Sequence, residues 1–414
     1  MSTFYYPSST LDVPSSKSSA SGEFFPESRR GSCTDSLFSD RSGSSSITLV
    51  SSTGQPRKHS LSGLELPLRQ SHDTSCHLCG YPVQPIPIPA ASAPDLAIEG
   101  RPFPINATRD LVIDHLKPLL ASVASRGRNL RIVGLLMSED EGCAMYSKMT
   151  GVNCGKLQVD YEVRDMRSQR DMAVLQAEIK RLNEDMEVDG LIFYTPCFGV
   201  EQDKEIRSWI SPRIDVEGFH PSYWSEATRI APPLLTENTN SASLADAPIY
   251  PCTPLAVVRA LQLQGLYNVS APAGSRLAGK VVTVVNRSDT VGLPLASMFV
   301  NEGALVFSID ITSTQVWESH NPSLGPCISN TILDTNTIYS MSDVVVSAVP
   351  SRAFKIPTSA LKPGVVAINV ASGMNNFEAD VKTKASRAAE RMGSLTVMML
   401  VMNALALRAR SVFE

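Results

Sequence analysis

Apolar residues follow regular patterns only from about residue 104 onward, and there helical and strand-like patterns alternate. Apolar side chains at helical spacing predict a helix over residues 110–125, and the short apolar run at 131–137 predicts a buried strand. The patterns further predict a helix over 142–154, a strand over 161–164, an amphipathic helix over 172–186 and a strand that ends at Pro196. Such alternation is typical of an α/β fold with a largely parallel sheet.

The most regular pattern lies between Lys280 and Asp310. A β-branched run at 281–285 predicts a strand, which is followed by a polar turn at 286–290. A helix over 291–301 and a second strand over 304–309 are predicted next. A strand, tight turn, helix and strand within about thirty residues have the size of one βαβ unit of a Rossmann-type domain.

The remaining C-terminal part contributes a helix, two strands and a final apolar segment. A double-proline turn at 250–254 opens a predicted helix over 255–263, and apolar runs at 343–347 and 365–369 predict two strands. The final segment, 395–408, ends in basic residues, as the C-terminus of a helix prefers. It is too short to span a bilayer, so we expect it to pack into the core.

The first 95 or so residues have a different composition, dominated by Ser, Thr, Pro and Gly. Such a segment buries too little apolar area to offset the entropy of ordering its backbone, so we predict a disordered extension over about 1–100 that ends in a Pro-rich linker. Cys76 and Cys79 with His72 suggest zinc. A zinc ribbon needs a second ligand pair at a defined spacing, which is missing, and no metal is predicted.

Charge and cysteine content narrow the functional class. The net charge is −4 and the sequence pI about 5.9, which indicates neither a nucleic-acid partner nor an anionic membrane surface. The eight cysteines are scattered, as in a chain with reduced thiols. No apolar run approaches the roughly 18 residues of a membrane span, and the N-terminus lacks the order of a secretory signal. We therefore expect a cytosolic protein, and a nuclear pool is also compatible with these features.

The turn after the first strand of the βαβ unit suits a dinucleotide, although it departs from the usual Gly-rich pattern. Asn286 stands where the first glycine is expected, and Gly292 lets backbone amides approach a diphosphate at the start of a helix. Asp310 lies at the end of the second strand, where a carboxylate binds both ribose hydroxyls and repels a 2′-phosphate, selecting NAD over NADP. Plain helix packing and a solvated strand end remain the alternatives.

Several segments together resemble the methylenetetrahydrofolate dehydrogenase/cyclohydrolase family, most closely its fungal NAD-dependent, dehydrogenase-only branch. They occur in the family order over about 110–410. They are Tyr146 in its helix, DGLIFYTPCFG (189–199), DVEGFHP (215–221), PCTP (251–254), NRSDTVGLPLA (286–296), the strand ending in Asp310, and GSLTVMML (393–400).

The resemblance implies a two-domain chain that binds tetrahydrofolate between its domains and assembles as a homodimer. The implied parts are a folate-binding domain at 101–250, a Rossmann NAD-binding domain at 251–390 and a C-terminal helix at 391–414 that returns to the first domain. The implied reaction, within one-carbon metabolism, is oxidation of 5,10-methylenetetrahydrofolate to the 5,10-methenyl form with hydride transfer to NAD. Such a reaction requires positioning and a suitable electrostatic environment more than an acid or base.

The resemblance also assigns residues to the substrate and the cofactor. Tyr146 would pack along the folate rings, Glu217 would bind the amino edge of the pterin, and Cys252 and Pro254 would shape the substrate site. The positions implied for the cofactor are Asn286, Arg287, Ser288, Val291, Gly292, Asp310, Ile311 and Thr396. Relatives that use NADP employ positions 287 and 288 near the 2′-phosphate. We expect the carboxylate of Asp310 to determine the choice of NAD despite these two positions. Arg287 would then contact the ribose, the diphosphate or Asp310 itself.

Two catalytic positions depart from the pattern of the bifunctional members. A lysine stands four residues after the tyrosine in those members, whereas this chain has Thr150, and their accompanying glutamine corresponds to Tyr194. Lys148 would point to nearly the opposite side of the helix. Without the lysine, no evident group poises water for attack, so we predict no cyclohydrolase activity. The alternatives are a bifunctional NADP-dependent relative and an inactive scaffold protein of the same fold.

Overall fold

The computed structural model describes residues 101–223, 229–235, 241–319 and 325–413. The predicted disordered extension and the Cys76–Cys79 pair lie outside the described residues. Within the described part, helices pack against two separate sheets, which confirms the predicted α/β class. No helix in that part is long and apolar enough to cross a membrane.

The smaller sheet has three parallel strands in the order β3-β2-β4. They are β2 (Arg131–Leu136), β3 (Asp160–Asp165) and β4 (Gly190–Phe193). The helices that alternate with them are α2 (Glu141–Lys156), α3 (Met172–Glu184) and α4 (Val200–Trp209). Successive residues of β2 point to opposite faces of the sheet, since Ile132 packs with α2 and Val133 packs with α3 and α4. Both faces of the sheet are therefore covered.

The larger sheet has eight strands in the order β1-β11-β10-β9-β5-β6-β7-β8. Their bounds are β1 (Arg101–Pro102), β5 (Val281–Val285), β6 (Leu305–Ile309), β7 (Thr314–Glu318), β8 (Cys327–Asn330), β9 (Val344–Ser347), β10 (Val366–Asn369) and β11 (Arg387–Ala389). Neighbours are parallel except in the β6–β7 and β7–β8 pairs, which are antiparallel. The chain continues from β5 to β6 on one side and reaches β9 on the other, so the strand order reverses between β5 and β9. Ligands of doubly wound sheets bind at the carboxyl ends of the strands beside such a reversal.

Short elements complete the fold around these sheets. They are α6 (Ser241–Ala245), α8 (Gly292–Val300), α9 (Thr335–Met341) and the 3-10 turns Arg167–Gln169, Pro212–Ile214, Thr358–Ala360 and Val381–Thr383. α8 packs on β5 and β6, as the predicted βαβ unit requires. The sequence patterns did not predict α4, β7, β8 or β11, and α7 begins at Cys252 rather than at residue 255.

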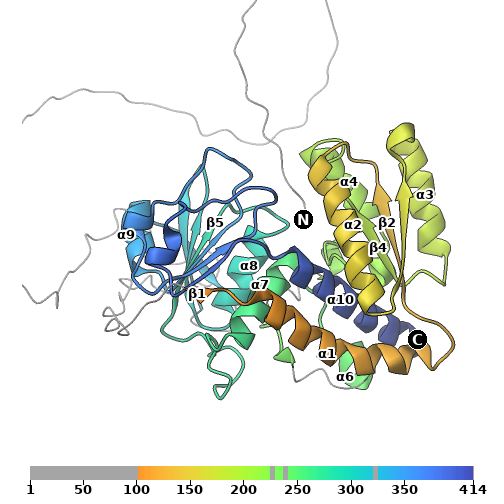
Figure 1. The fold of residues 1–414 in the computed structure, drawn as a ribbon, viewed down its shortest axis with the longest axis horizontal. Coiled ribbons are helices and arrows are strands. Elements are labelled where there is room, and N and C mark those ends of the chain that lie inside the picture. The colour runs from red at the N-terminus through yellow and green to blue at the C-terminus, as the bar shows by residue number, and fades with distance from the viewer. Residues whose placement is uncertain (1–100, 224–228, 236–240, 320–324, 414) are drawn as a thin grey trace, which may run out of the picture. The chain divides into compact units, whose positions relative to one another are not determined.

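The longest helix, α10 (Gly393–Phe413), is buried as its apolar composition predicts. It packs against α1 (Ile105–Ala124), α2, α6 and α7 (Cys252–Leu263), and Figure 1 shows it in dark blue alongside the orange α1. Elements from the beginning, the middle and the end of the described chain therefore share one core.

Polar side chains of α10 join segments that are far apart in the sequence. The Asn403 side-chain amide donates two hydrogen bonds, each 2.9 Å, to the carbonyl oxygens of Val216 and Tyr250. Arg408 forms an ion pair of 3.1 Å with Asp189, which is only 3% exposed and also accepts a hydrogen bond of 3.0 Å from Arg128. These contacts connect α10 to the loops that contain Val216 and Tyr250 and to Asp189, which precedes β4.

We expect Asn403→Ala to lower the free energy of unfolding by about 2–4 kcal/mol, because it leaves two buried carbonyl groups without their donor. Urea denaturation of the purified protein measures the change. Asn336→Ala, at an exposed position of α9, is the matched control and should change stability by less than about 0.5 kcal/mol. Equal effects of the two substitutions would contradict the assigned role of Asn403.

Candidate active site

Helix α2 places Tyr146 in a buried environment beside the small sheet. The helix begins after Asp140, whose carboxylate accepts a hydrogen bond of 3.1 Å from the Cys143 N–H. Tyr146 is 6% exposed, and its ring meets the Tyr194 ring edge to face, with 5.9 Å between centroids. Its hydroxyl has no hydrogen-bond partner among the described residues. Burial raises the pKa of Tyr146 well above its usual value, so this hydroxyl is a neutral donor.

A third tyrosine that sequence reasoning missed, Tyr161 of β3, joins this pair. Its hydroxyl and that of Tyr194 are hydrogen-bonded to each other. Gly134 of β2 makes room for both rings, because a Cβ there would lie 2.6 Å from the Tyr161 hydroxyl oxygen and 2.8 Å from Tyr194 Cε2. A glycine inside an apolar strand often marks such a close approach, and it was the signal available in the sequence.

Thr150 lies one helical turn after Tyr146 and is fully buried. Its hydroxyl donates a hydrogen bond of 2.9 Å to the Tyr146 carbonyl oxygen. Lys148 is exposed to solvent, in keeping with its expected direction. The position that carries a lysine in the bifunctional pattern therefore holds a neutral hydroxyl that is engaged within its own helix.

Glu217 is held by a tight loop that packs against the start of α7. Gly218 has a φ of +73°, and a Cβ there would lie 2.6 Å from the Tyr250 carbonyl oxygen, so this close approach requires glycine. The Glu217 carbonyl accepts a hydrogen bond of 3.2 Å from the Cys252 N–H, and its carboxylate accepts one of 3.2 Å from the Phe193 N–H. Asp215 closes the loop by accepting hydrogen bonds of 3.0 and 2.6 Å from the Gly218 and His220 N–H groups.

Burial governs the ionisation of this group of side chains. Burial and, to a smaller extent, the charge of the nearby Asp215 raise the pKa of Glu217 to about 7, while the hydrogen bond from the Phe193 N–H and the charge of Arg207 oppose the rise. Burial and the charge of Glu217 raise the pKa of the Cys252 thiol to about 12, so the thiol stays protonated. Glu217 also raises the pKa of Tyr146. Glu217 is the group here whose charge changes near neutral pH.

The structure thus brings most of the predicted substrate residues to one place. Tyr146, Tyr194, Glu217 and Cys252 come from α2, the end of β4, the 215–218 loop and the start of α7, and they interact through ring contact or charge. Pro254 is buried in the first turn of α7, where proline costs the helix no hydrogen bond. No group of three or more His, Cys, Asp or Glu side chains in the described ranges is arranged to hold a metal ion.

The predicted nucleotide loop crosses the point where the strand order reverses. Asn286 follows β5 with a φ of +81°, and its side-chain amide donates a hydrogen bond of 2.7 Å to the carbonyl of Ala348, which follows β9. A Cβ on Gly292 would lie 1.8 Å from the Asn286 carbonyl oxygen, so no other residue fits at the first position of α8. Ser288 accepts the Leu293 N–H through its carbonyl at 3.0 Å. The loop is folded tightly over the N-terminus of α8.

Arg287 makes its hydrogen bonds to residues other than Asp310. Its guanidinium donates hydrogen bonds of 2.9 Å to the Ser308 hydroxyl and 3.1 Å to the Ser313 hydroxyl. Asp310 is partly exposed at the end of β6, and its carboxylate accepts the Ile311 N–H at 2.8 Å. Burial lowers the pKa of Arg287 and the charge of Asp310 opposes this, so the two groups interact without a direct hydrogen bond. The hydroxyls of Ser308 and Ser313 hold the guanidinium in place.

The other predicted cofactor positions differ in exposure. Ile311 is 82% exposed beside Asp310, whereas Val291 is 9% exposed and directly precedes α8. Thr396 is fully buried in α10 and donates to the Met392 carbonyl one turn earlier, at 3.3 Å. Thr290, which the sequence patterns did not indicate, has a buried hydroxyl without a partner among the described residues.

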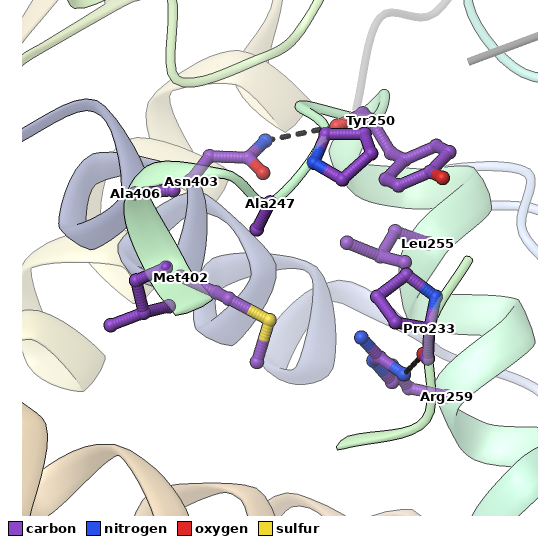
Figure 2. Close-up of a pocket in the computed structure, with 10 residues that line it drawn as sticks. Pro233, Ala247, Tyr250, Leu255, Arg259, Met402, Asn403 and Ala406 are labelled. Atoms are coloured by element: carbon purple, nitrogen blue, oxygen red, sulfur yellow. Dashed lines mark hydrogen bonds between the residues drawn. The ribbon is translucent and has the colours of Figure 1, made fainter. Parts of the chain in front are cut away.

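A small cavity lies elsewhere, between α10 and α7. Figure 2 shows Asn403 beside it, with its side-chain amide directed at the Tyr250 backbone, and Arg259 donating to the Pro233 carbonyl. Its volume of about 10 Å³ is about the room that one water needs. This cavity is too small for a folate or a dinucleotide, so it is not the candidate site.

Comparison with known proteins shows the family to which the chain belongs. Residues 106–217 match the model of the catalytic domain of tetrahydrofolate dehydrogenase/cyclohydrolase. The chain belongs to the tetrahydrofolate dehydrogenase/cyclohydrolase family, an α/β family of folate enzymes. The matched segment contains the three tyrosines, Thr150 and Glu217.

Individual relatives extend the similarity over both sheets. The chain is 35% identical over 290 residues to methylenetetrahydrofolate dehydrogenase [NAD(+)] of Saccharomyces cerevisiae, covering 68% of this chain and 87% of that one. It is 33% identical over 276 residues to the enzyme of the same name from Schizosaccharomyces pombe, covering 66% and 83%. The solved structure of the NAD-dependent 5,10-methylenetetrahydrofolate dehydrogenase of S. cerevisiae aligns with a TM-score of 0.65 at 30% identity, covering 75% of this chain and 96% of that chain.

We expect Glu217→Gln to gain stability relative to the wild type as pH rises. The pKa of Glu217 is raised from 4.5 to about 7 in the folded protein, so the stability that the protonated acid contributes is lost between these values. The free energy of unfolding of the wild type should fall relative to the variant by about 2 kcal/mol between pH 5 and pH 8. Thermal melts at several pH values check this, and a pH-independent difference would contradict it.

Proposed function

We propose that the protein oxidises 5,10-methylenetetrahydrofolate to 5,10-methenyltetrahydrofolate by hydride transfer to NAD, without hydrolysing the product. The observation that carries this proposal is the buried group of Tyr146, Tyr194 and Glu217, which offers aromatic faces, a neutral hydroxyl and a carboxylate within a family of folate enzymes. The relatives named as NAD-dependent dehydrogenases support the reaction and the cofactor.

The substrate residues have distinct tasks in this proposal. The pterin is flat and apolar on its faces, so it packs against the Tyr146 ring, which Tyr194 supports from the side. The carboxylate of Glu217 accepts N–H groups from the amino edge of the pterin. Cys252 and Pro254 shape the wall at the start of α7. The lone pair of a folate nitrogen expels the hydride, so these side chains position the substrate rather than transfer protons.

The nucleotide loop has the features that a dinucleotide requires. Gly292 allows the 286–292 loop to fold closely over the N-terminus of α8, where backbone N–H groups favour a diphosphate. Asn286, Ser288 and Val291 form the rest of this cradle, and Asp310 binds the adenosine ribose. Bound NAD supplies C4 of its nicotinamide as the hydride acceptor. Ile311 lies against the adenosine, and Thr396 contacts the cofactor from α10.

The absence of cyclohydrolase activity follows from the chemistry of two positions. Thr150 turns its hydroxyl to the backbone of its own helix, and Tyr194 shares its hydroxyl with Tyr161. Neither is a cation or a base, so the site has no evident group to activate water at the methenyl carbon. Lys148 is exposed to solvent and does not replace the missing lysine.

Three further parts of the proposal concern the whole chain. We propose that residues 101–250 bind the folate, 251–390 bind NAD and 391–414 return to the first domain. The packing of α10 on α1, α2 and α6 supports this return, and α10 also packs on α7 at the start of the second domain. A homodimer and a cytosolic location, with a nuclear pool as an open alternative, stay predictions. Size-exclusion chromatography with light scattering measures the oligomeric state.

One assay tests the central proposal. Purified protein is incubated with methylenetetrahydrofolate and either NAD or NADP, and the absorbance of reduced cofactor and of methenyl product is followed. We expect turnover with NAD to exceed that with NADP, and no hydrolysis of added methenyltetrahydrofolate above the uncatalysed rate. Turnover mainly with NADP together with rapid hydrolysis would identify a bifunctional enzyme, and no turnover with either cofactor would identify an inactive scaffold.

We expect Asp310→Ser to lower the preference for NAD over NADP by about tenfold or more, because it removes charged hydrogen bonds to the ribose and the repulsion of a 2′-phosphate. The ratio of kcat/KM for the two cofactors measures this preference. Asp114→Ser, at an exposed carboxylate on α1, is the control and should leave the ratio unchanged. An unchanged ratio in Asp310→Ser would refute the assigned role of Asp310.

A further inference from the structure

Arg207 is a buried cation that the proposed reaction does not use. It lies on α4 and is 7% exposed, and its Nη1 has no hydrogen-bond partner among the described residues. Its guanidinium carbon lies 5.6 Å from the centre of the Phe219 ring, two residues after Glu217. Burying a guanidinium with an unpartnered nitrogen is unfavourable unless nearby charge offsets the loss of hydration. Nearby carboxylates must therefore stabilise the buried guanidinium of Arg207.

Four carboxylates interact with Arg207, and three of them are satisfied by two backbone N–H groups or by a lysine at the surface. They are Asp203, Asp215, Glu217 and Asp289. Asp203 accepts the N–H groups of residues 197 and 198, each at 2.9 Å, and Asp215 accepts those of 218 and 220. Asp289 is exposed and pairs with Lys204 at 3.2 Å.

Glu217 is the exception among the four, since its carboxylate accepts one hydrogen bond of 3.2 Å, from the Phe193 N–H. It is also 6% exposed, so water does little to stabilise its charge. Arg207 is therefore the cation placed to compensate a buried carboxylate that the backbone leaves largely unsatisfied.

We propose that Arg207 is a positioning residue for the substrate: its buried guanidinium is the counter-ion that favours the ionised form of Glu217, the form that accepts the N–H groups of the pterin. This inference rests on the proposed function for the role of Glu217 in binding. A carboxylic acid donates from one oxygen, whereas a carboxylate accepts at both, so loss of the charge removes the match to a donor edge. The effect of Arg207 on the folate is exerted through Glu217.

The other titratable groups facing Glu217 do not supply this charge. Tyr146 comes from α2, Tyr161 from β3 and Cys252 from α7, and all three are neutral because burial raises their pKa values. Asp215, from the same loop, raises the pKa of Glu217, whereas Arg207 lowers it. Among the described residues, Arg207 is thus the side chain whose charge favours the anion.

The first test reads the ionisation of Glu217 without relying on turnover. Unfolding free energies are measured from pH 5 to pH 9 for the wild type, Glu217→Gln, Arg207→Met and the double variant. In the wild-type background, the stability of Glu217→Gln relative to its parent should rise with pH and level off at about pH 7. In the Arg207→Met background, we expect the same difference to level off about one pH unit higher. The same levelling pH in a folded Arg207→Met protein overturns the proposal.

The second test reads substrate binding. Arg207→Met should raise KM for methylenetetrahydrofolate about fivefold at pH 7 with a smaller change in kcat, and KM should recover as pH rises. Arg207→Lys, which keeps the charge, should restore most of the binding. Lys204→Met is the matched control on the same helix and should keep the wild-type pH profile. In the Glu217→Gln background, Arg207→Met should add nothing further.

The outcomes separate this inference from the proposed function. No reduced cofactor from the wild type would reject the proposed reaction, while the stability test still decides whether Arg207 controls Glu217. An active wild type in which Arg207→Met keeps the wild-type KM profile would overturn the inference and leave the reaction standing. An equal rise of KM in the presence and absence of Glu217 would also overturn it, because Arg207 would then act directly.

Discussion

The two hydrogen bonds from the Asn403 side chain determine much of the substrate side of the molecule. They hold the Val216 and Tyr250 carbonyls to the same buried amide of α10, and Gly218 closely approaches the same Tyr250 carbonyl. Glu217 sits inside this arrangement, so its position depends on a helix that is almost two hundred residues away in the sequence (187 residues separate Asn403 from Val216). Because a side-chain amide has two donor hydrogens, one residue satisfies both loops.

Local patterns predicted the elements whose own residues carry a clear signal. The β-branched run of β5, the apolar final helix and the amphipathic α3 were all evident, and so was the α/β class. The mostly polar sequence of α4 has no apolar stripe of that kind, and it buries Ile206 and Arg207 through tertiary packing. Strands β7 and β8 mix polar and apolar residues and depend on pairing with β6 rather than on composition.

The candidate site shows the same division between local and tertiary information. Family resemblance indicated Tyr146, Thr150, Tyr194 and Glu217 because they lie in recognisable segments. Tyr161 was not indicated, since its meeting with Tyr194 requires that β3 and β4 flank a glycine of β2. Arg207 was missed because an arginine in a charged helix is expected in solvent, and only the fold shows that it is buried.

The burial of α10 has a consequence for the way the protein is made. The helix packs against α1 and α2, which leave the ribosome long before it does, and its apolar side chains complete a core shared with α7. During synthesis those earlier helices expose the surfaces that α10 covers, and such surfaces bind chaperones or other nascent chains. Contacts so distant in sequence also slow the final step of folding. The order of translation therefore makes α10 the last element to complete the core, and the time before its emergence is when the chain is most prone to aggregate.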